Sequence, residues 1–388
     1  GEAHMRNFSM KNMVWKNPGH ELDDIAANIT SDKKIILAGT EEEIKRFIDK
    51  NKDIPVDALV LSDYIKISSD LKQLCGHVNE YIIVSASTDR DSFEIAENEL
   101  CNTYGYTLNK NFFQAEIFSA IWYVYKCNKV YLDRIEIFLT PCCTLKCEKC
   151  IAFIPYFKDK EPTSLQSLKE DADLLFAKAD YVRKLKLLGG EGFLYPYLVE
   201  YIDYLYDNYA DKIGEIRIGT NGTIKPKADV LECCRRHNVI IDISDYTNAV
   251  PNLCKLEEMT DFFADQGIAY DVKRVGEQWL DMGFPCVKNV KNDDKELHEH
   301  FYKCAMFCRD FYDGKLFFCC SNFAAVRAGL FPANENDYLD FSQEFDKKVL
   351  LEYELGYSKL GYTTFCKECN GCSEEVNQRH VPVAEQLN

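Results

Sequence analysis

The chain has 388 residues and 18 cysteines, and its 46 Lys and Arg against 63 Asp and Glu give a formal net charge of −17 at pH 7. This acidity excludes nucleic acid and anionic membranes as expected partners, because both are bound through clustered basic side chains. No apolar run approaches the roughly 18–20 residues of a membrane span. No signal peptide opens the chain, and Gly1 to Met5 are typical of a cloning remnant.

Residues 1–32 form an N-terminal segment, and residues 33–128 are predicted to form a Rossmann-like α/β domain. Alternating apolar and helical segments indicate a parallel sheet. Strands are expected at 33–39, 57–62 and 81–85, with helices at 41–50, 64–75 and 89–104. The first strand-to-helix turn carries Glu41, Glu42 and Glu43, whose charges repel phosphate. We therefore expect docking or scaffolding here rather than dinucleotide binding.

Residues 129–290 continue the alternation of strand and helix, which predicts a full or partial (β/α) barrel. The expected fold is a partial (β/α)6 TIM-like barrel of the α/β class. Strands are expected at 134–139, 184–188, 215–219, 239–244 and 269–275, with helices near 165–180, 197–210, 226–236 and 254–265. In such barrels the chemistry lies at the carboxyl ends of the strands.

Residues 291–388 form a different, cysteine-rich domain. A polar helix is expected near 293–303 and another near 341–354. Between them, Asp313-Gly314 is a typical hairpin turn joining strands at 309–312 and 315–319.

The first cysteine cluster follows the strand at 134–139. Cys143, Cys147 and Cys150 are spaced C-x3-C-x2-C, so three thiolates can hold one corner of a soft metal centre. A structural zinc usually has four protein ligands. Three ligands favour a [4Fe–4S] cluster with one iron left open, and Cys142 is interpreted as a bystander.

This motif resembles that of the radical S-adenosylmethionine (radical SAM) superfamily, and three further strand ends fit: Leu188-Gly-Gly-Glu191, Arg217-Ile-Gly-Thr-Asn-Gly-Thr223 and Asp242-Ile-Ser-Asp245. The resemblance implies one-electron cleavage of SAM to methionine and a 5′-deoxyadenosyl radical that abstracts a substrate hydrogen. It also implies an external electron donor of the flavodoxin or ferredoxin type and a cytoplasmic, anaerobic setting. The SAM-binding residues that it implies are Gly189, Gly190, Glu191, Thr220, Asn221 and Ser244.

Two positions depart from the family pattern. Lys149 stands where an aromatic residue usually touches adenine, and Gly192 stands where Pro is common. Recognition of adenine must therefore depend on backbone or on another side chain.

The second cysteine cluster, Cys304-x9-Gly314-x4-Cys319 followed by Cys366-x2-Cys369-x2-Cys372, resembles the SPASM and twitch domains of that superfamily. The resemblance implies one auxiliary [4Fe–4S] cluster on Cys304, Cys319, Cys366 and Cys369. Cys308, Cys320 and Cys372 are alternates or ligands of a second auxiliary cluster, and a zinc ribbon is the other explanation of such paired cysteines.

The sequence leaves the reaction open. We expect oxidation or epimerisation of a carbohydrate or aminocyclitol, because the single auxiliary cluster resembles that of a twitch dehydrogenase. For epimerisation, Cys286 is the hydrogen donor to test. The alternative is modification of a peptide or protein by crosslinking, thioether formation or side-chain oxidation, and the third hypothesis is a non-catalytic metal-binding protein. His298 and His300 lie on a polar segment and are expected to be solvated.

Overall fold

The computed structural model describes residues 13–61, 77–286, 290–304 and 308–387, and the chain divides into two compact units. The first unit contains the chain up to Val130 together with Phe345–Gly361. The second contains Tyr131–Glu344 and the chain from Tyr362 onward, so the predicted border at residue 290 lies inside it. In the described ranges, no helix is long and apolar enough to cross a membrane.

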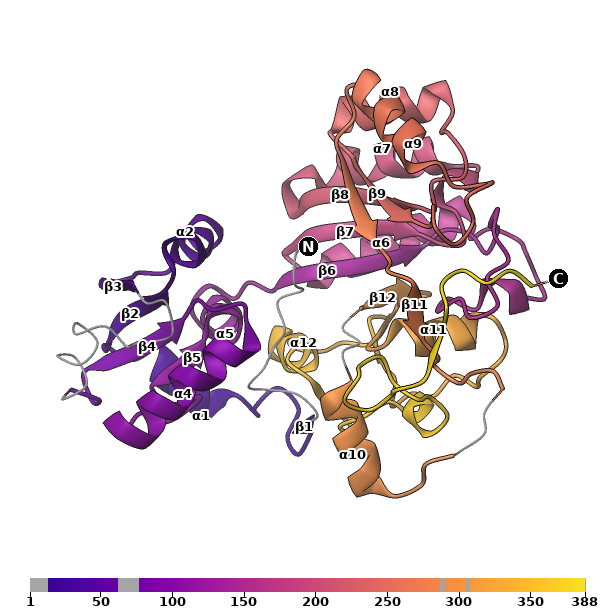
Figure 1. The fold of residues 1–388 in the computed structure, drawn as a ribbon. Helices are drawn as coiled ribbons and strands as arrows, with labels where there is room; N and C mark the ends of the chain where they lie inside the picture. The colour runs from indigo at the N-terminus through magenta and orange to yellow at the C-terminus, as the bar shows by residue number, and fades with distance from the viewer. Residues whose placement is uncertain (1–12, 62–76, 287–289, 305–307, 388) are drawn as a thin grey trace. The chain divides into compact units, whose positions relative to one another are not determined.

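The first unit is built on a four-stranded parallel sheet in the order β3-β2-β4-β5 (Figure 1). The parallel α/β prediction is therefore confirmed. Its strands are β2 (Lys34–Gly39), β3 (Ala58–Leu61), β4 (Tyr81–Ser85) and β5 (Phe112–Gln114), and its helices are α1 (Asp23–Ile29), α2 (Glu41–Lys50), α4 (Arg90–Tyr104), α5 (Ala115–Cys127) and α12 (Lys347–Glu354). A short pair joins β1 (Met13–Val14) to β15 (Tyr357–Ser358). The helix predicted at 64–75 lies outside the described residues.

The helices that follow β2 and β4 begin with side-chain caps. Thr40 Oγ1 accepts a hydrogen bond from Glu43 N at 3.3 Å, and Thr40 N donates back to the Glu43 carboxylate at 3.0 Å. At the start of α4, Asp89 accepts from Ser92 N at 2.9 Å. A phosphate at either place would compete with a carboxylate for these amides, in agreement with the low expectation of dinucleotide binding.

The second unit contains five parallel strands in chain order, β6 to β10, with helices between them. The sheet is open, as in a partial barrel, and β12 pairs parallel with β6 through Asp310 and Glu136. The strands are β6 (Tyr131–Phe138), β7 (Tyr181–Leu188), β8 (Ile213–Thr220), β9 (Ile240–Asp245) and β10 (Tyr270–Arg274), and the helices are α6 (Leu165–Lys178), α7 (Leu198–Tyr209), α8 (Ala228–His237) and α9 (Leu256–Asp265). Short 3-10 turns are η1 (Ile154–Tyr156), η2 (Gly192–Leu194) and η3 (Ala210–Lys212).

The predicted hairpin extends this sheet beyond β12. Asp313 and Gly314 both have positive φ angles, 52° and 66°, as a two-residue hairpin turn requires. Two carboxylate oxygens of Asp171 on α6 accept hydrogen bonds from the amides of this turn, at 3.0 Å from Asp313 N and 2.7 Å from Gly314 N. The elements of this region are β12 (Asp310–Tyr312), β13 (Lys315–Phe317), β14 (Tyr338–Asp340), α10 (Asp294–Lys303), α11 (Cys320–Arg327) and η4 (Thr364–Lys367).

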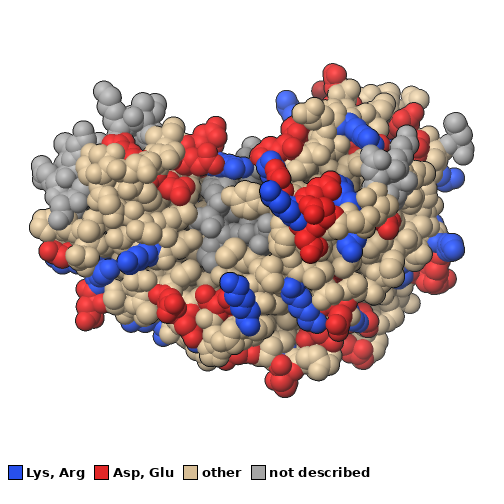
Figure 2. Space-filling model, turned by 90° about the horizontal axis from the view of Figure 1, so that it is seen from below, with Lys and Arg blue, Asp and Glu red and all other residues tan. Residues whose placement is uncertain are grey.

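Two further strands bring the end of the chain back to the barrel. β11 (Gln278–Leu280) pairs antiparallel with β16 (His380–Pro382). The face drawn in Figure 2 carries interspersed acidic and basic side chains. Inside the second unit, an aromatic core that includes Phe138, Phe153, Phe284, Phe323 and Phe365 packs against cysteines of both clusters.

Candidate metal and S-adenosylmethionine site

The first cysteine cluster lies in the loop that follows β6. Cys147 is buried, and Cys143 and Cys150 are partly buried. Burial, together with the charges of Cys150, Glu191 and Cys147, raises the pKa of the Cys143 thiol to about 12. Three bare thiolates are therefore unfavourable here, whereas a soft metal centre would stabilise them. The donor set fits an iron–sulfur cluster.

Gly189 and Gly190 allow the end of β7 to approach the backbone of this loop. A Cβ on Gly189 would lie 2.3 Å from Thr140 O, and one on Gly190 would lie 2.3 Å from Cys142 O and 2.8 Å from Cys143 Cβ. In their place, Gly190 N donates to Thr140 O at 2.7 Å, and Glu191 N donates to Cys142 O at 2.8 Å. The close approach of the two backbones therefore requires glycine at both positions, whether or not SAM also contacts them.

The Glu191 carboxylate is fully buried and joins two strand ends. Its oxygens accept hydrogen bonds from Asn221 N at 2.8 Å and from Phe193 N at 3.2 Å, and the side chain is 0% exposed. Burial raises the pKa of Glu191 to about 7. In this arrangement the carboxylate holds the end of β8 beside the end of β7, and its binding of SAM stays a prediction.

The Thr220-Asn221-Gly222 segment contacts the cysteine loop. Asn221 Nδ2 donates to Thr144 Oγ1 at 2.9 Å and reaches Cys143 Sγ at 3.5 Å. Thr220 Oγ1 accepts from Gly222 N at 3.1 Å, which closes the turn. Ser244, at the end of β9, is hydrogen-bonded to Tyr246. The predicted SAM-binding positions therefore lie at the carboxyl ends of β7, β8 and β9, on or beside the cysteine loop.

Sequence reasoning did not identify two aromatic residues next to the cysteines. Tyr246 and Trp279 meet edge to face, with ring centroids 5.9 Å apart, and both pack against a small core that contains Leu145 and Cys147. Lys149 instead pairs with Asp281, its Nζ 3.3 Å from Oδ1. No local motif predicts the contact between Tyr246 and Trp279, because Trp279 comes from β11, more than 30 residues further along the chain.

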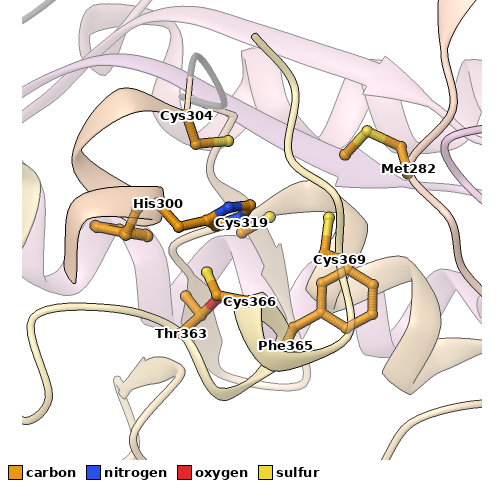
Figure 3. A pocket seen from close by; sticks show the side chains of 9 residues that line it. Met282, His300, Cys304, Cys319, Thr363, Phe365, Cys366 and Cys369 are labelled. Carbon is orange, nitrogen blue, oxygen red and sulfur yellow. The ribbon is translucent and has the colours of Figure 1, made fainter. Parts of the chain in front are cut away.

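The second cysteine cluster surrounds one pocket. Its lining includes the four predicted ligands Cys304, Cys319, Cys366 and Cys369, whose side chains come from three segments and face a common space (Figure 3). Burial raises the pKa of Cys366 to about 12, and the charge of Cys304 adds to this effect. Backbone amides also approach the sulfurs, since Gly371 N lies 3.3 Å from Cys369 Sγ and Cys372 N lies 3.4 Å from Cys304 Sγ. The four thiols fit a second iron–sulfur cluster.

The three alternate cysteines do not line this pocket. The Cys320 thiol is hydrogen-bonded to Cys308, and this bond and burial raise the pKa of Cys320. The backbone amide of Cys372 donates to Cys304 Sγ, as described above. These three residues stay predicted alternates, and they lie outside the lining of the pocket.

The expectation for His300 is wrong. His300 is 6% exposed and lines the four-cysteine pocket. It shares the buried face of α10 with Leu297 and Phe301, at the three- and four-residue spacing of a helix. A Cβ on Gly371 would lie 2.9 Å from His300 Cε1, so the glycine makes room for the imidazole. His298 instead meets Tyr362 edge to face at 5.2 Å.

Cys286 is exposed and follows Phe284 of the aromatic core by two residues. A negative charge on Cys286 would contribute to raising the pKa of Tyr156, after burial and the charge of Glu148. Its function as a hydrogen donor stays a prediction.

No protein-family model and no curated protein matches the chain. Solved structures with a similar fold include BtrN in complex with AdoMet and 2-DOIA (14% identity, TM-score 0.40, covering 67% of this chain and 100% of that one). They also include native anSMEcpe with bound AdoMet (12%, 0.37, 62% and 89%) and Streptococcus suis SuiB (16%, 0.31, 59% and 45%). At this level of similarity they assign neither a substrate nor a residue role to this chain.

Proposed function

We propose that this chain is a radical SAM enzyme with one auxiliary iron–sulfur cluster. The observation that carries the proposal is the convergence of the C-x3-C-x2-C loop with the Gly189–Glu191 and Thr220–Gly222 strand ends, through backbone and side-chain hydrogen bonds. A structural zinc site needs four protein ligands, and it does not need glycines such as Gly189 and Gly190 that let a neighbouring strand end approach the cysteine loop.

In this proposal Cys143, Cys147 and Cys150 hold a [4Fe–4S] cluster that binds SAM, and the four-cysteine pocket holds the auxiliary cluster. When bound, the first cluster supplies the electron that cleaves SAM to the 5′-deoxyadenosyl radical, which abstracts a substrate hydrogen. The chain's own residues position these groups. Glu191 keeps the two strand ends together, and Asn221 orients Thr144 beside Cys143.

For the reaction, we propose oxidation or epimerisation of a carbohydrate or aminocyclitol. The support is that the described residues form one four-thiol pocket, because a single auxiliary cluster can accept the second electron of an alcohol oxidation. In an epimerisation Cys286 would return the hydrogen. Modification of a peptide is the competing reaction. It needs the same site of SAM cleavage, formed by Cys143, Cys147, Cys150 and the neighbouring strand ends, which we call the initiation site.

The initiation site is tested by replacing Cys143, Cys147 and Cys150 with Ala together. The reconstituted variant should lose reductive SAM cleavage and fall from about eight irons per chain to about four, since each [4Fe–4S] cluster holds four irons. Replacing Cys127, which lies at the end of α5 outside the site, with Ala is the matched control and should leave both the iron content and SAM cleavage unchanged. Cleavage of SAM by the triple variant would contradict the proposal.

A further inference from the structure

The last residues of the chain lie along the first cysteine loop. The β11–β16 pair carries the chain to this position, and Val383 N extends it by donating to Glu277 O at 3.2 Å. Val383 and Ala384 are 5% and 1% exposed and pack with Leu145 and Cys147. We call residues 383–387 the C-terminal strap.

The strap is bonded to the loop on both sides of Cys147. Glu148 N donates to Glu385 O at 2.8 Å, and Leu387 N donates to Lys146 O at 2.8 Å. These bonds form an antiparallel bridge in which Cys147 faces Gln386. The middle cysteine of the motif is therefore held by a segment almost 240 residues away in sequence.

The side chain of Gln386 completes this contact. Its Oε1 accepts a hydrogen bond from Lys146 N at 2.7 Å, and its Nε2 donates to Ala384 O at 2.6 Å and to Cys147 Sγ at 3.3 Å. The first two bonds determine the orientation of the amide, because its oxygen must face an N–H and its nitrogen must face a carbonyl. An N–H group is consequently aimed at the cysteine sulfur before any metal is bound.

We propose that the C-terminal strap is a working part of the initiation site, in which Gln386 is a positioning residue whose N–H raises the reduction potential of the cluster held by Cys147. The inference rests on the proposed function. Hydrogen bonds to ligand sulfurs stabilise the more negatively charged reduced form of an iron–sulfur cluster and raise its potential. The strap bonds to Lys146 and Glu148 also keep the loop in its metal-binding conformation.

The test compares the reconstituted full-length protein with Gln386→Leu, which removes the donor. The cluster whose EPR signal changes on addition of SAM should have a more negative midpoint potential in the variant, and its iron should pass to a chelator about fivefold faster, as expected for the loss of one hydrogen bond. Gln378→Leu, an exposed glutamine of the same tail, is the matched control and should change neither quantity. An unchanged potential in Gln386→Leu would overturn the proposal.

A second measurement does not depend on iron. In the metal-free protein, deletion of residues 385–388 should accelerate amide hydrogen exchange in the loop 144–150 and leave exchange in β6 unchanged. Equal exchange in the loop with and without these residues would show that the strap does not hold it. If the unaltered chain shows no SAM-responsive cluster, the proposed function itself fails, which is a distinct result.

Discussion

At the scale of single residues, Glu191 shows how one side chain can connect a motif to the fold. Its position after two glycines makes it one of the SAM-binding residues that the family resemblance implies. In the structure both of its oxygens accept backbone N–H groups, and the end of β8 depends on them. The sequence predicts Glu191 as a SAM-binding residue, and that function stays a prediction. Its buried partners could not be predicted because they come from the end of the next strand and from the turn that follows Glu191 itself.

Tyr246 is the residue that we expect to replace the missing aromatic residue at Lys149. Its ring lies with Trp279 beside the cysteine loop. If it stacks on adenine, Tyr246→Leu should weaken SAM binding by roughly 5- to 150-fold, because stacking of a base on an aromatic ring contributes roughly 1–3 kcal/mol. Isothermal titration calorimetry on the cluster-loaded protein measures this change.

Two further variants make that measurement specific. Tyr246→Phe keeps the ring and should bind SAM nearly as the unaltered chain does. Tyr197→Leu removes an exposed tyrosine outside the site and should have no effect. Normal SAM affinity in Tyr246→Leu, at full iron content, would assign adenine recognition to other groups.

At the scale of elements, the alternation of strand-like and helical segments predicted the strands β6 to β10 and the helices between them. Helix α5 was not predicted. Its residues are buried around most of its circumference, from Ile117 to Val124, so that it has no polar face to reveal a helical period. β11 and β16 were also missed, since three-residue strands leave almost no alternation to detect.

The contact between α6 and the hairpin turn gives a prediction about stability. Asp171→Ala leaves the amides of Asp313 and Gly314 without their acceptor, which should lower the free energy of unfolding by about 1–3 kcal/mol. Urea denaturation followed by circular dichroism measures this loss. Asp261→Ala, which removes an exposed aspartate on α9, should be nearly neutral.

The same residue predicts a pH dependence. Burial raises the pKa of Asp171 from 3.8 to about 6. Between about pH 4 and pH 6 the unfolded chain therefore releases this proton while the folded chain keeps it, so that the contribution of Asp171 to stability falls as the pH rises. The difference between the unaltered chain and Asp171→Ala should be larger at pH 5 than at pH 8. A difference that does not vary with pH would contradict the assignment of this carboxyl.

At the scale of the whole molecule, the sequence predicts two separate cysteine clusters, but it could not show what surrounds them. The spacing of Cys366 and Cys369 identifies a knuckle, and the structure places Cys304, Cys319 and His300 around the same pocket. The sequence analysis predicted His300 wrongly because most residues of its helix are charged or polar. The buried face of that helix consists of only three residues, Leu297, His300 and Phe301. Gln386 gave no signal, because its contact with Cys147 joins opposite ends of the second unit's sequence.

The class of substrate is the remaining question that one experiment can decide. The experiment incubates reconstituted protein, SAM and a strong reductant with candidate aminocyclitols or sugars, and in separate reactions with candidate peptides. Each candidate is deuterated at the carbons that could lose hydrogen. Our proposal expects deuterium in 5′-deoxyadenosine from a small alcohol and not from a peptide. Deuterium from a peptide alone would reverse the assignment of the substrate class and leave the proposed initiation site unchanged.

Solvent deuterium in the product then separates oxidation from epimerisation. An oxidation incorporates none, whereas an epimerisation that returns hydrogen from an exchangeable thiol such as Cys286 incorporates one, and Cys286→Ala should abolish only that incorporation.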